Sequence, residues 1–261
     1  MDLETFLISL FVLIDDWVSD VRPREPKRRP GRQTLLSDGE VLTLAILCQW
    51  QRFRSERDFW RFVDAHLRGY FPDLLSKASS TGAFVRVRAC RMGLFAGQAS
   101  FGRSVSKTEW VYGFKVALSV TPEGVVTSFG LTPANCDERP IDEFLVSSEG
   151  RDTFLADKGF SSVEWERRWL EEYGALVAAT PQESARRAWP EKARRWAAGK
   201  RQLIEGVIWQ LKDQFSLERH RAKTLGGLLA HLAAKVAAYT CGQVLNRGLG
   251  RPLRHLAALL I

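Results

Sequence analysis

The chain has 261 residues, of which 45% are hydrophobic, and it carries a formal net charge of +8 at pH 7. This composition excludes a disordered chain and is sufficient for one large globular domain or for two smaller ones. The positive charge favours a polyanionic partner, nucleic acid first, although a merely solvated basic surface has the same charge.

The cysteine pattern and the apolar stretches exclude further classes of protein. Four cysteines lie far apart without a C-x-x-C pair, so neither a disulfide framework nor a zinc ribbon is expected. The N-terminus has acids where a signal peptide needs basic residues, and the apolar stretch 223–245 is interrupted by His231 and Lys235. We therefore expect no membrane segment, a core helix at 223–245 and a reducing compartment.

Residues 1–72 are predicted to form a helical domain. Residues 2–20 have the pattern of an amphipathic helix. Ser37 and Glu40 form an S-x-x-E capping box at the start of the next helix, and Ser55 is the expected N-cap of a third. Such a domain, rich in short helices, is a candidate for DNA binding.

A basic, proline-rich arm follows the first helix at residues 22–32. It contains six basic residues and one acid, and its prolines oppose continuation of the helix. Arg28 and Arg29 in this arm are therefore candidate contacts to DNA phosphates.

Residues 73–261 are predicted to form an α/β domain, because β-rich runs and helical patterns alternate after Pro72. The expected order is βββ-α-β-α-β-α. Strands are predicted at 83–90, 111–121, 125–133, within 153–160 and at 175–180, and helices after Asp137, at 163–173 and at 200–215.

Two segments of this domain carry candidate functional residues. The fourth strand, FLADKGF, ends on Asp157, and Lys158 follows it. The helix at 200–215 has Arg201, Glu205 and Lys212 at offsets of four and seven residues, which places them along one edge of its apolar stripe. The simplest interpretation of the last three residues is a solvated ion pair between Arg201 and Glu205.

Together these residues resemble the DDE-type insertion-sequence transposases, most closely insertion-sequence family 982. The signature helix of that family reads Y-x2-R-x3-E-x6-K, and the chain has Ala198, Arg201, Glu205 and Lys212 at those positions, so that three of the four match. The segments ADKGF, YGFKVAL and LTPANCDE also resemble the family, and the likeness runs from about residue 85 to residue 245.

The resemblance implies an α/β, RNase H-like mixed sheet with flanking helices in residues 73–261, preceded by the all-helical domain. It implies that Asp157 and Glu205 are catalytic acids that bind Mg²⁺ or Mn²⁺, and that Arg201, Lys212 and Lys158 contact DNA. Hard divalent ions prefer oxygen ligands, which explains the use of carboxylates. The implied partners are double-stranded DNA with terminal inverted repeats and a second copy of the chain on that DNA, in the bacterial cytoplasm at the nucleoid.

The first of the three acids that such transposases use is missing from the expected place. Residues 74–108 contain six basic residues and no acid. We therefore expect an internal deletion that truncates the domain at its first strand and impairs catalysis. Asp73 and Glu109 are the nearest possible substitutes. The alternative is a DNA-binding protein without catalytic activity that occupies transposon ends, whereas a helix-turn-helix repressor would leave ADKGF and the R-x3-E-x6-K pattern unexplained.

Overall fold

The computed structural model describes residues 1–21, 36–50, 53, 55–72, 95–104, 109–137, 139–149, 151–157, 160–181, 189–219 and 222–259. The chain divides into two compact units. The helical unit comprises Met1–Cys90 together with Leu211–Ile261, and the α/β unit comprises Arg91–Gln210. Each unit is described separately below.

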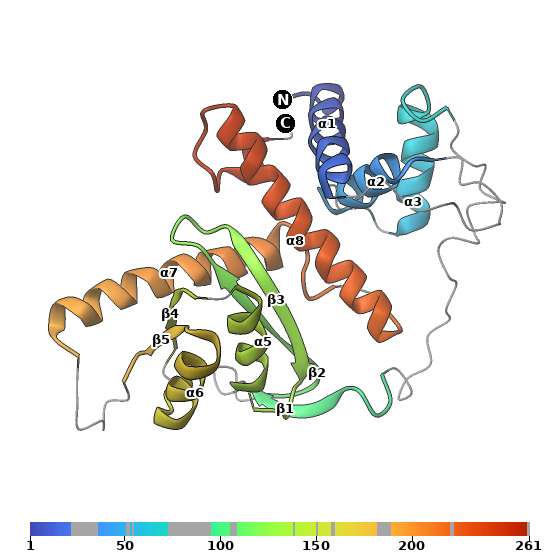
Figure 1. The fold of residues 1–261 in the computed structure, drawn as a ribbon. Coiled ribbons are helices and arrows are strands. Elements are labelled where there is room, and N and C mark those ends of the chain that lie inside the picture. The colour runs from blue at the N-terminus through green and yellow to red at the C-terminus, as the bar shows by residue number, and fades with distance from the viewer. Residues whose placement is uncertain are drawn as a thin grey trace. The chain divides into compact units, whose positions relative to one another are not determined.

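The helices of the helical unit begin where the local sequence signals predict (Figure 1). The Glu40 N–H donates to Ser37 Oγ at 3.2 Å while the Ser37 N–H donates to Glu40 Oε2 at 2.6 Å, which confirms the capping box. Ser55 Oγ accepts from the Asp58 N–H at 3.2 Å as the predicted N-cap. The elements are α1 (Leu3–Val21), α2 (Asp38–Trp50), α3 (Glu56–Phe62), the π-turn η1 (Val63–Leu67), α8 (Leu225–Gly248) and the 3-10 turn η3 (Leu256–Ala258).

The core of this unit forms where α1, α2 and α8 pack on one another. The Trp50 ring meets Phe6 edge-on, with 5.1 Å between ring centroids, and meets Phe215 at 5.3 Å. Gly242 of α8 lies under this indole, since a Cβ there would come within 2.6 Å of the Trp50 ring. The C-terminal helix is thus a core element of the helical unit.

This grouping differs from the predicted division of the chain at residue 72. The segment after Leu211 clusters with the N-terminal helices and not with the α/β unit. Sequence patterns could not indicate it, because an apolar helix face does not specify which partner will cover it.

Among the described residues, α8 is the one helix long and apolar enough to cross a membrane. Eight of its residues are buried, and they include the polar side chains of Lys235, Gln243 and Asn246. Its packing against α1 and α2 is that of the predicted core helix.

Three antiparallel strands open the α/β unit, in the order β1 (Ser100–Ser104), β2 (Glu109–Val120), β3 (Val126–Pro133). The hairpin of β2 and β3 is the predicted one. Helix α5 (Arg139–Glu149) lies against β2 and β3 (Figure 1). The close approach depends on Gly130 of β3, because a Cβ at this position would lie 2.7 Å from Cγ1 of Ile141.

A second sheet pairs β4 (Thr153–Ala156) in parallel with β5 (Leu176–Ala179). Helix α6 (Val163–Tyr173) connects them. Ser162 Oγ caps its N-terminus, and Gly174 ends it in the left-handed conformation, with φ 69°. The two caps bound the helix at the residues predicted for it, 163–173.

From β2 onward the described elements follow the predicted order ββ-α-β-α-β-α, but the described strands form two sheets rather than one mixed sheet. The predicted strand at 83–90 lies outside the described residues, and the first described strand, β1, was not predicted. Helix α7 (Glu191–Asp213) begins nine residues before the predicted start at Lys200. The ion pair between Arg195 and Glu191 and the buried Ala197 show why the basic segment is helical there.

The buried Lys235 predicts a pH-dependent stability of the helical unit. Its ammonium donates to the carbonyls of Phe215 at 2.5 Å and Ser216 at 3.1 Å, and burial lowers the pKa of Lys235 from 10.5 to about 8. Between these values the unfolded chain binds more protons than the folded one. The free energy of unfolding should therefore rise from pH 8 to pH 10.5, by up to roughly 3 kcal/mol from this group.

Chemical denaturation of the wild type and of Lys235→Met across this pH range measures the contribution. The difference between the two curves gives the contribution of Lys235 together with its electrostatic interaction with the Cys48 thiol, whose pKa burial raises to about 12. Lys192→Met, at an exposed lysine of α7, serves as the control and should follow the wild type. A pH dependence unchanged in Lys235→Met would contradict the expectation.

The contact between Gly130 and Ile141 predicts an energetic coupling. Gly130→Ala forces the Ile141 side chain to move and should lower the free energy of unfolding by about 1–3 kcal/mol. Ile141→Ala removes the obstructing atoms. The double variant should therefore lose less free energy of unfolding than the two single variants lose in sum. Additive effects in a double-mutant cycle would refute this packing.

Candidate functional site

Asp157 lies directly after the carboxyl end of a parallel strand. The register of β4 and β5 ends with Ala156 opposite Ala179, and the Thr180 N–H extends the pairing by donating to the Ala156 carbonyl at 3.1 Å. The chain then turns, since the Phe160 N–H donates to the Asp157 carbonyl at 3.0 Å. Carboxyl ends of parallel strands are the usual edge for ligand sites in α/β proteins.

Helix α7 carries Arg201 and Glu205 one turn apart. In the apolar stripe predicted from the sequence, Val207 is fully buried. Arg201 and Glu205 remain exposed at the margin of this stripe. The helix therefore presents both charged side chains to solvent.

The Arg201 guanidinium joins the two acids. Its Nε donates to Glu205 Oε1 at 3.1 Å, and its Nη1 donates to Asp157 Oδ1 at 3.2 Å. The ion pair of Arg201 with Glu205 is the solvated pair that the spacing alone predicts. The contact with Asp157 connects residues 44 positions apart, and spacing alone does not predict it.

All three side chains of this cluster are accessible to solvent. Their exposed fractions are 45% for Asp157, 56% for Arg201 and 60% for Glu205. At such exposure each ion pair contributes little to stability. An incoming cation could therefore replace Arg201 as the partner of either acid at low cost, and an incoming phosphate could replace either acid as the partner of Arg201.

The donor set fits a hard divalent cation in chemical type. Two carboxylates that accept hydrogen bonds from one guanidinium face a common point, and carboxylate oxygens are the ligands that Mg²⁺ and Mn²⁺ prefer. The number of acids is low, since no group of three or more His, Cys, Asp or Glu side chains that could hold a metal occurs within the described ranges. Asp157 and Glu205 are thus the two residues that would hold such an ion.

The other predicted residues have different positions. Lys212, near the end of α7, pairs with Glu218 at 2.7 Å. Glu109 is the first residue of β2, opposite Ser104. The remaining candidates lie outside the described residues, so their predicted roles stay predictions: Arg28, Arg29, Asp73 and Lys158.

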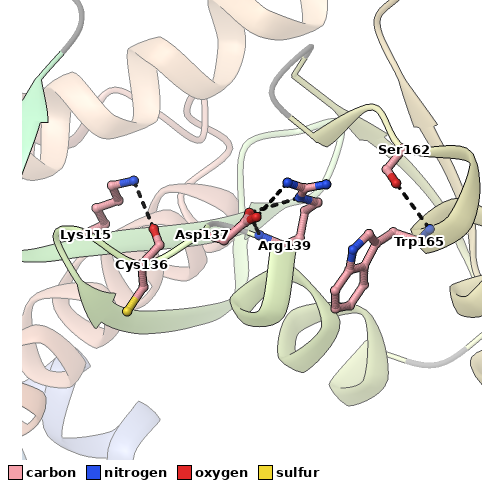
Figure 2. Close-up of polar contacts among 6 residues, drawn as sticks. All are labelled: Lys115, Cys136, Asp137, Arg139, Ser162 and Trp165. Carbon is pink, nitrogen blue, oxygen red and sulfur yellow. Dashed lines mark hydrogen bonds and ion pairs between the residues drawn. The ribbon is translucent and has the colours of Figure 1, made fainter.

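Asp137 supports the start of α5, the helix predicted to follow it. Its Oδ1 accepts from the backbone N–H of Arg139 at 3.1 Å, and both carboxylate oxygens bind the Arg139 guanidinium (Figure 2). The pKa of Arg139 is raised, chiefly because its side chain donates to Asp137. The carboxylate is therefore engaged in a local structural contact.

Lys115 is a cation near this region that the sequence reasoning missed. It lines a small cavity of about 160 Å³ together with Thr132, Ile141 and Phe160 of the ADKGF segment. Its ammonium donates to the Cys136 carbonyl at 3.3 Å (Figure 2). The only available signal was its place in YGFKVAL, because a single lysine in a strand does not reveal what lies beside it.

The bridge predicts that Arg201 competes with cations for the two acids. Arg201→Gln removes the positive charge between Asp157 and Glu205, so the site should bind Mn²⁺ roughly tenfold more tightly. Titration of the protein with Mn²⁺, followed by electron paramagnetic resonance of the free ion, measures this without any enzymatic assay. The unfolding free energy should change by less than about 1 kcal/mol.

A matched control for that experiment lies on the same helix. Arg195 pairs with Glu191 at the same i,i+4 spacing, and Arg195→Gln should leave Mn²⁺ binding unchanged. Adding Asp157→Asn to Arg201→Gln should abolish the gain in affinity. If Arg201→Gln binds Mn²⁺ no better than the wild type, the two acids do not form a common cation site.

Comparison with known proteins gives one match. The sequence model of the family described as "Transposase DDE domain" matches residues 78–225, more than half of the chain, a range that contains both Asp157 and Glu205. No curated protein and no solved structure matches the chain. The chain, in which Arg201 joins the acid that follows β4 to an acid on α7, belongs to the transposase DDE domain family.

Proposed function

We propose that this transposase-family protein binds the terminal inverted repeats of an insertion sequence, with Asp157 and Glu205 as the remaining acids of its metal site. The observation that carries the proposal is the Arg201 bridge between these two carboxylates. They come from a strand end and a helix that are distant in sequence, and their convergence supports a shared site. In this reading the domain is RNase H-like, as in the insertion-sequence relatives it resembles.

The proposed chemistry is cleavage and transfer of a phosphodiester strand. When bound, a divalent ion such as Mg²⁺ or Mn²⁺ would activate the attacking oxygen and stabilise the leaving oxygen. Asp157 and Glu205 would hold that ion. Arg201, displaced from the acids, would then be free to donate to a phosphate, for which the planar guanidinium is well suited.

Further basic residues support a DNA partner. Lys212 stands two helical turns from Glu205 on α7, and Lys158 follows Asp157 in the sequence. The arm at 22–32, with Arg28 and Arg29, adds charge that phosphates would neutralise. We place the protein at the bacterial nucleoid, where it acts as a dimer on two DNA ends.

We propose that catalysis by this copy is impaired. The sequence from residue 74 to residue 108 has no acid, so the first carboxylate of a three-acid site has no counterpart at its expected position. A metal site with two carboxylates provides less anionic charge than one with three, and cation affinity depends on that charge. An internal deletion before the segment AFVRVRAC explains the loss.

A second candidate function is DNA binding without cleavage. It is favoured by the contact of Arg201 with both acids, because one guanidinium already partly neutralises the pair. Such a protein would occupy transposon ends and compete with an intact transposase.

A gel-shift assay run beside a cleavage assay tests both functions. The DNA is a duplex that carries the repeats flanking the gene, with Mg²⁺ or Mn²⁺ present, and an intact transposase of the family is the positive control. We expect specific binding, with strand cleavage at least about 10³-fold slower than in the intact enzyme, since the missing ligand removes several kcal/mol of stabilisation.

Variants separate the outcomes of these assays. Asp157→Asn and Glu205→Gln should abolish residual cleavage and leave DNA binding within about threefold. Cleavage at the rate of the intact enzyme would refute impairment. Failure to distinguish the repeats from unrelated DNA would refute the proposed function as a whole.

A further inference from the structure

Three large aromatic side chains are exposed on the hairpin of β1 and β2. The exposed fractions are 65% for Phe101, 71% for Trp110 and 45% for Tyr112. Phe101 stands opposite Tyr112 in the ladder, and Trp110 stands two residues before Tyr112 on the same strand. Since side chains of a strand alternate between faces, the three rings belong to one face, which we call the aromatic face.

The opposite face of the same strands is covered. The Ser100 hydroxyl accepts from the Asn135 N–H at 2.9 Å, and a Cβ at Gly102 would lie 2.2 Å from the Ala134 carbonyl oxygen. Phe101, which lies between these two residues, therefore points away from the loop that follows β3. The exposure of the aromatic face thus follows from the register.

The rings are arranged so that their surfaces remain available. The centroids of Phe101 and Tyr112 lie 4.9 Å apart with the planes tilted by 53°, so the two rings do not stack flat on each other. Trp110 and Tyr112 are separated by about 7 Å along the strand. A second aromatic contact, between Phe95 and Phe114 at 5.3 Å, extends the row along β2.

Exposing this much aromatic surface on an edge hairpin is unfavourable unless something binds it. The sequence around β1 indicates what binds. Strand β1 lies in the stretch 74–108, which has six basic residues and no acid before Glu109, and Arg103 of β1 stands opposite Trp110 in the ladder, so the partner is expected to be anionic. Aromatic rings interleaved with basic residues are typical of surfaces for single-stranded nucleic acid, because each unpaired base can stack on a ring.

We propose that the aromatic face binds single-stranded DNA by stacking unpaired bases on Phe101, Tyr112 and Trp110. Duplex DNA does not fit this surface, because its bases are already stacked within the helix. The proposal rests on the proposed function, in which strand cleavage and transfer at a transposon end generate unpaired nucleotides. It assigns the β1–β2 hairpin a role separate from that of Asp157 and Glu205.

Fluorescence anisotropy with a labelled oligothymidine of about twelve nucleotides tests the proposal. Phe101→Leu combined with Trp110→Leu keeps apolar side chains at both positions and removes the rings. We expect affinity for the single strand to fall about 10- to 100-fold at fixed salt, while affinity for a duplex that carries the transposon end changes less than about threefold.

Control variants distinguish stacking from a general effect on folding. Phe144→Leu removes an exposed ring from α5 in the same unit, where Phe144 is 58% exposed, and should leave single-strand binding unchanged. Phe101→Tyr with Trp110→Phe keeps rings at both positions and should retain most of the affinity.

Two results would overturn the proposal in distinguishable ways. The Leu variant could lose single-strand and duplex binding equally, or lose neither. Either result would refute binding of single-stranded DNA by the aromatic face and would leave the proposed function intact. Absence of binding to both forms of DNA by the wild type would eliminate the proposed function together with this inference.

Discussion

A single guanidinium held between two carboxylates is the constraint on which the functional interpretation depends. Arg201 can reach Asp157 only if the carboxyl end of β4 and the middle of α7 meet in the α/β unit. The ion pairs themselves are exposed and therefore too weak to impose that meeting. Val207 of α7 is fully buried whereas Arg201 and Glu205 of the same helix are exposed, so burial of the apolar stripe determines which side of the helix carries the charged residues.

Charge balance explains how a two-acid site differs from a three-acid site. Asp157 and Glu205 bring two negative charges, and Arg201 offsets one of them, which leaves a weak net field for a divalent ion. A third carboxylate would restore the excess that makes a doubly charged ion preferable to a guanidinium. In the proposed function, the absence of a third acid would therefore change more than the number of ligands, because it would shift the competition between the ion and Arg201.

Local signals in the sequence predicted most elements, and long-range pairing accounts for what they missed. Hydrogen bonds within a few residues specify the capping box at Ser37, the N-cap at Ser55 and the β2–β3 turn, so a sequence pattern is sufficient for each. The site was predicted in part: the spacing indicated the pair of Arg201 with Glu205, and only the family resemblance brought in Asp157. Strand β1 is short and polar, and its sequence lacks the alternation that predicts a strand. The association of α8 with the N-terminal helices depends on which apolar faces meet. The separation into two sheets also depends on strand pairing across the chain, which side-chain alternation cannot specify.

The position of β1 in its sheet explains why the aromatic face is exposed. Strand β1 is the outer strand of the three-stranded sheet among the described residues, and on one face Ser100 and Gly102 lie against the loop at Ala134 and Asn135. The Phe101 ring therefore stands on the other face, where it is exposed. The exposure of Phe101, Trp110 and Tyr112, of which Phe101 lies in the basic stretch 74–108, is explained by the proposed ligand, which is both anionic and aromatic. Unpaired nucleotides have both properties, whereas an apolar protein partner would leave the excess of basic residues without a counterpart.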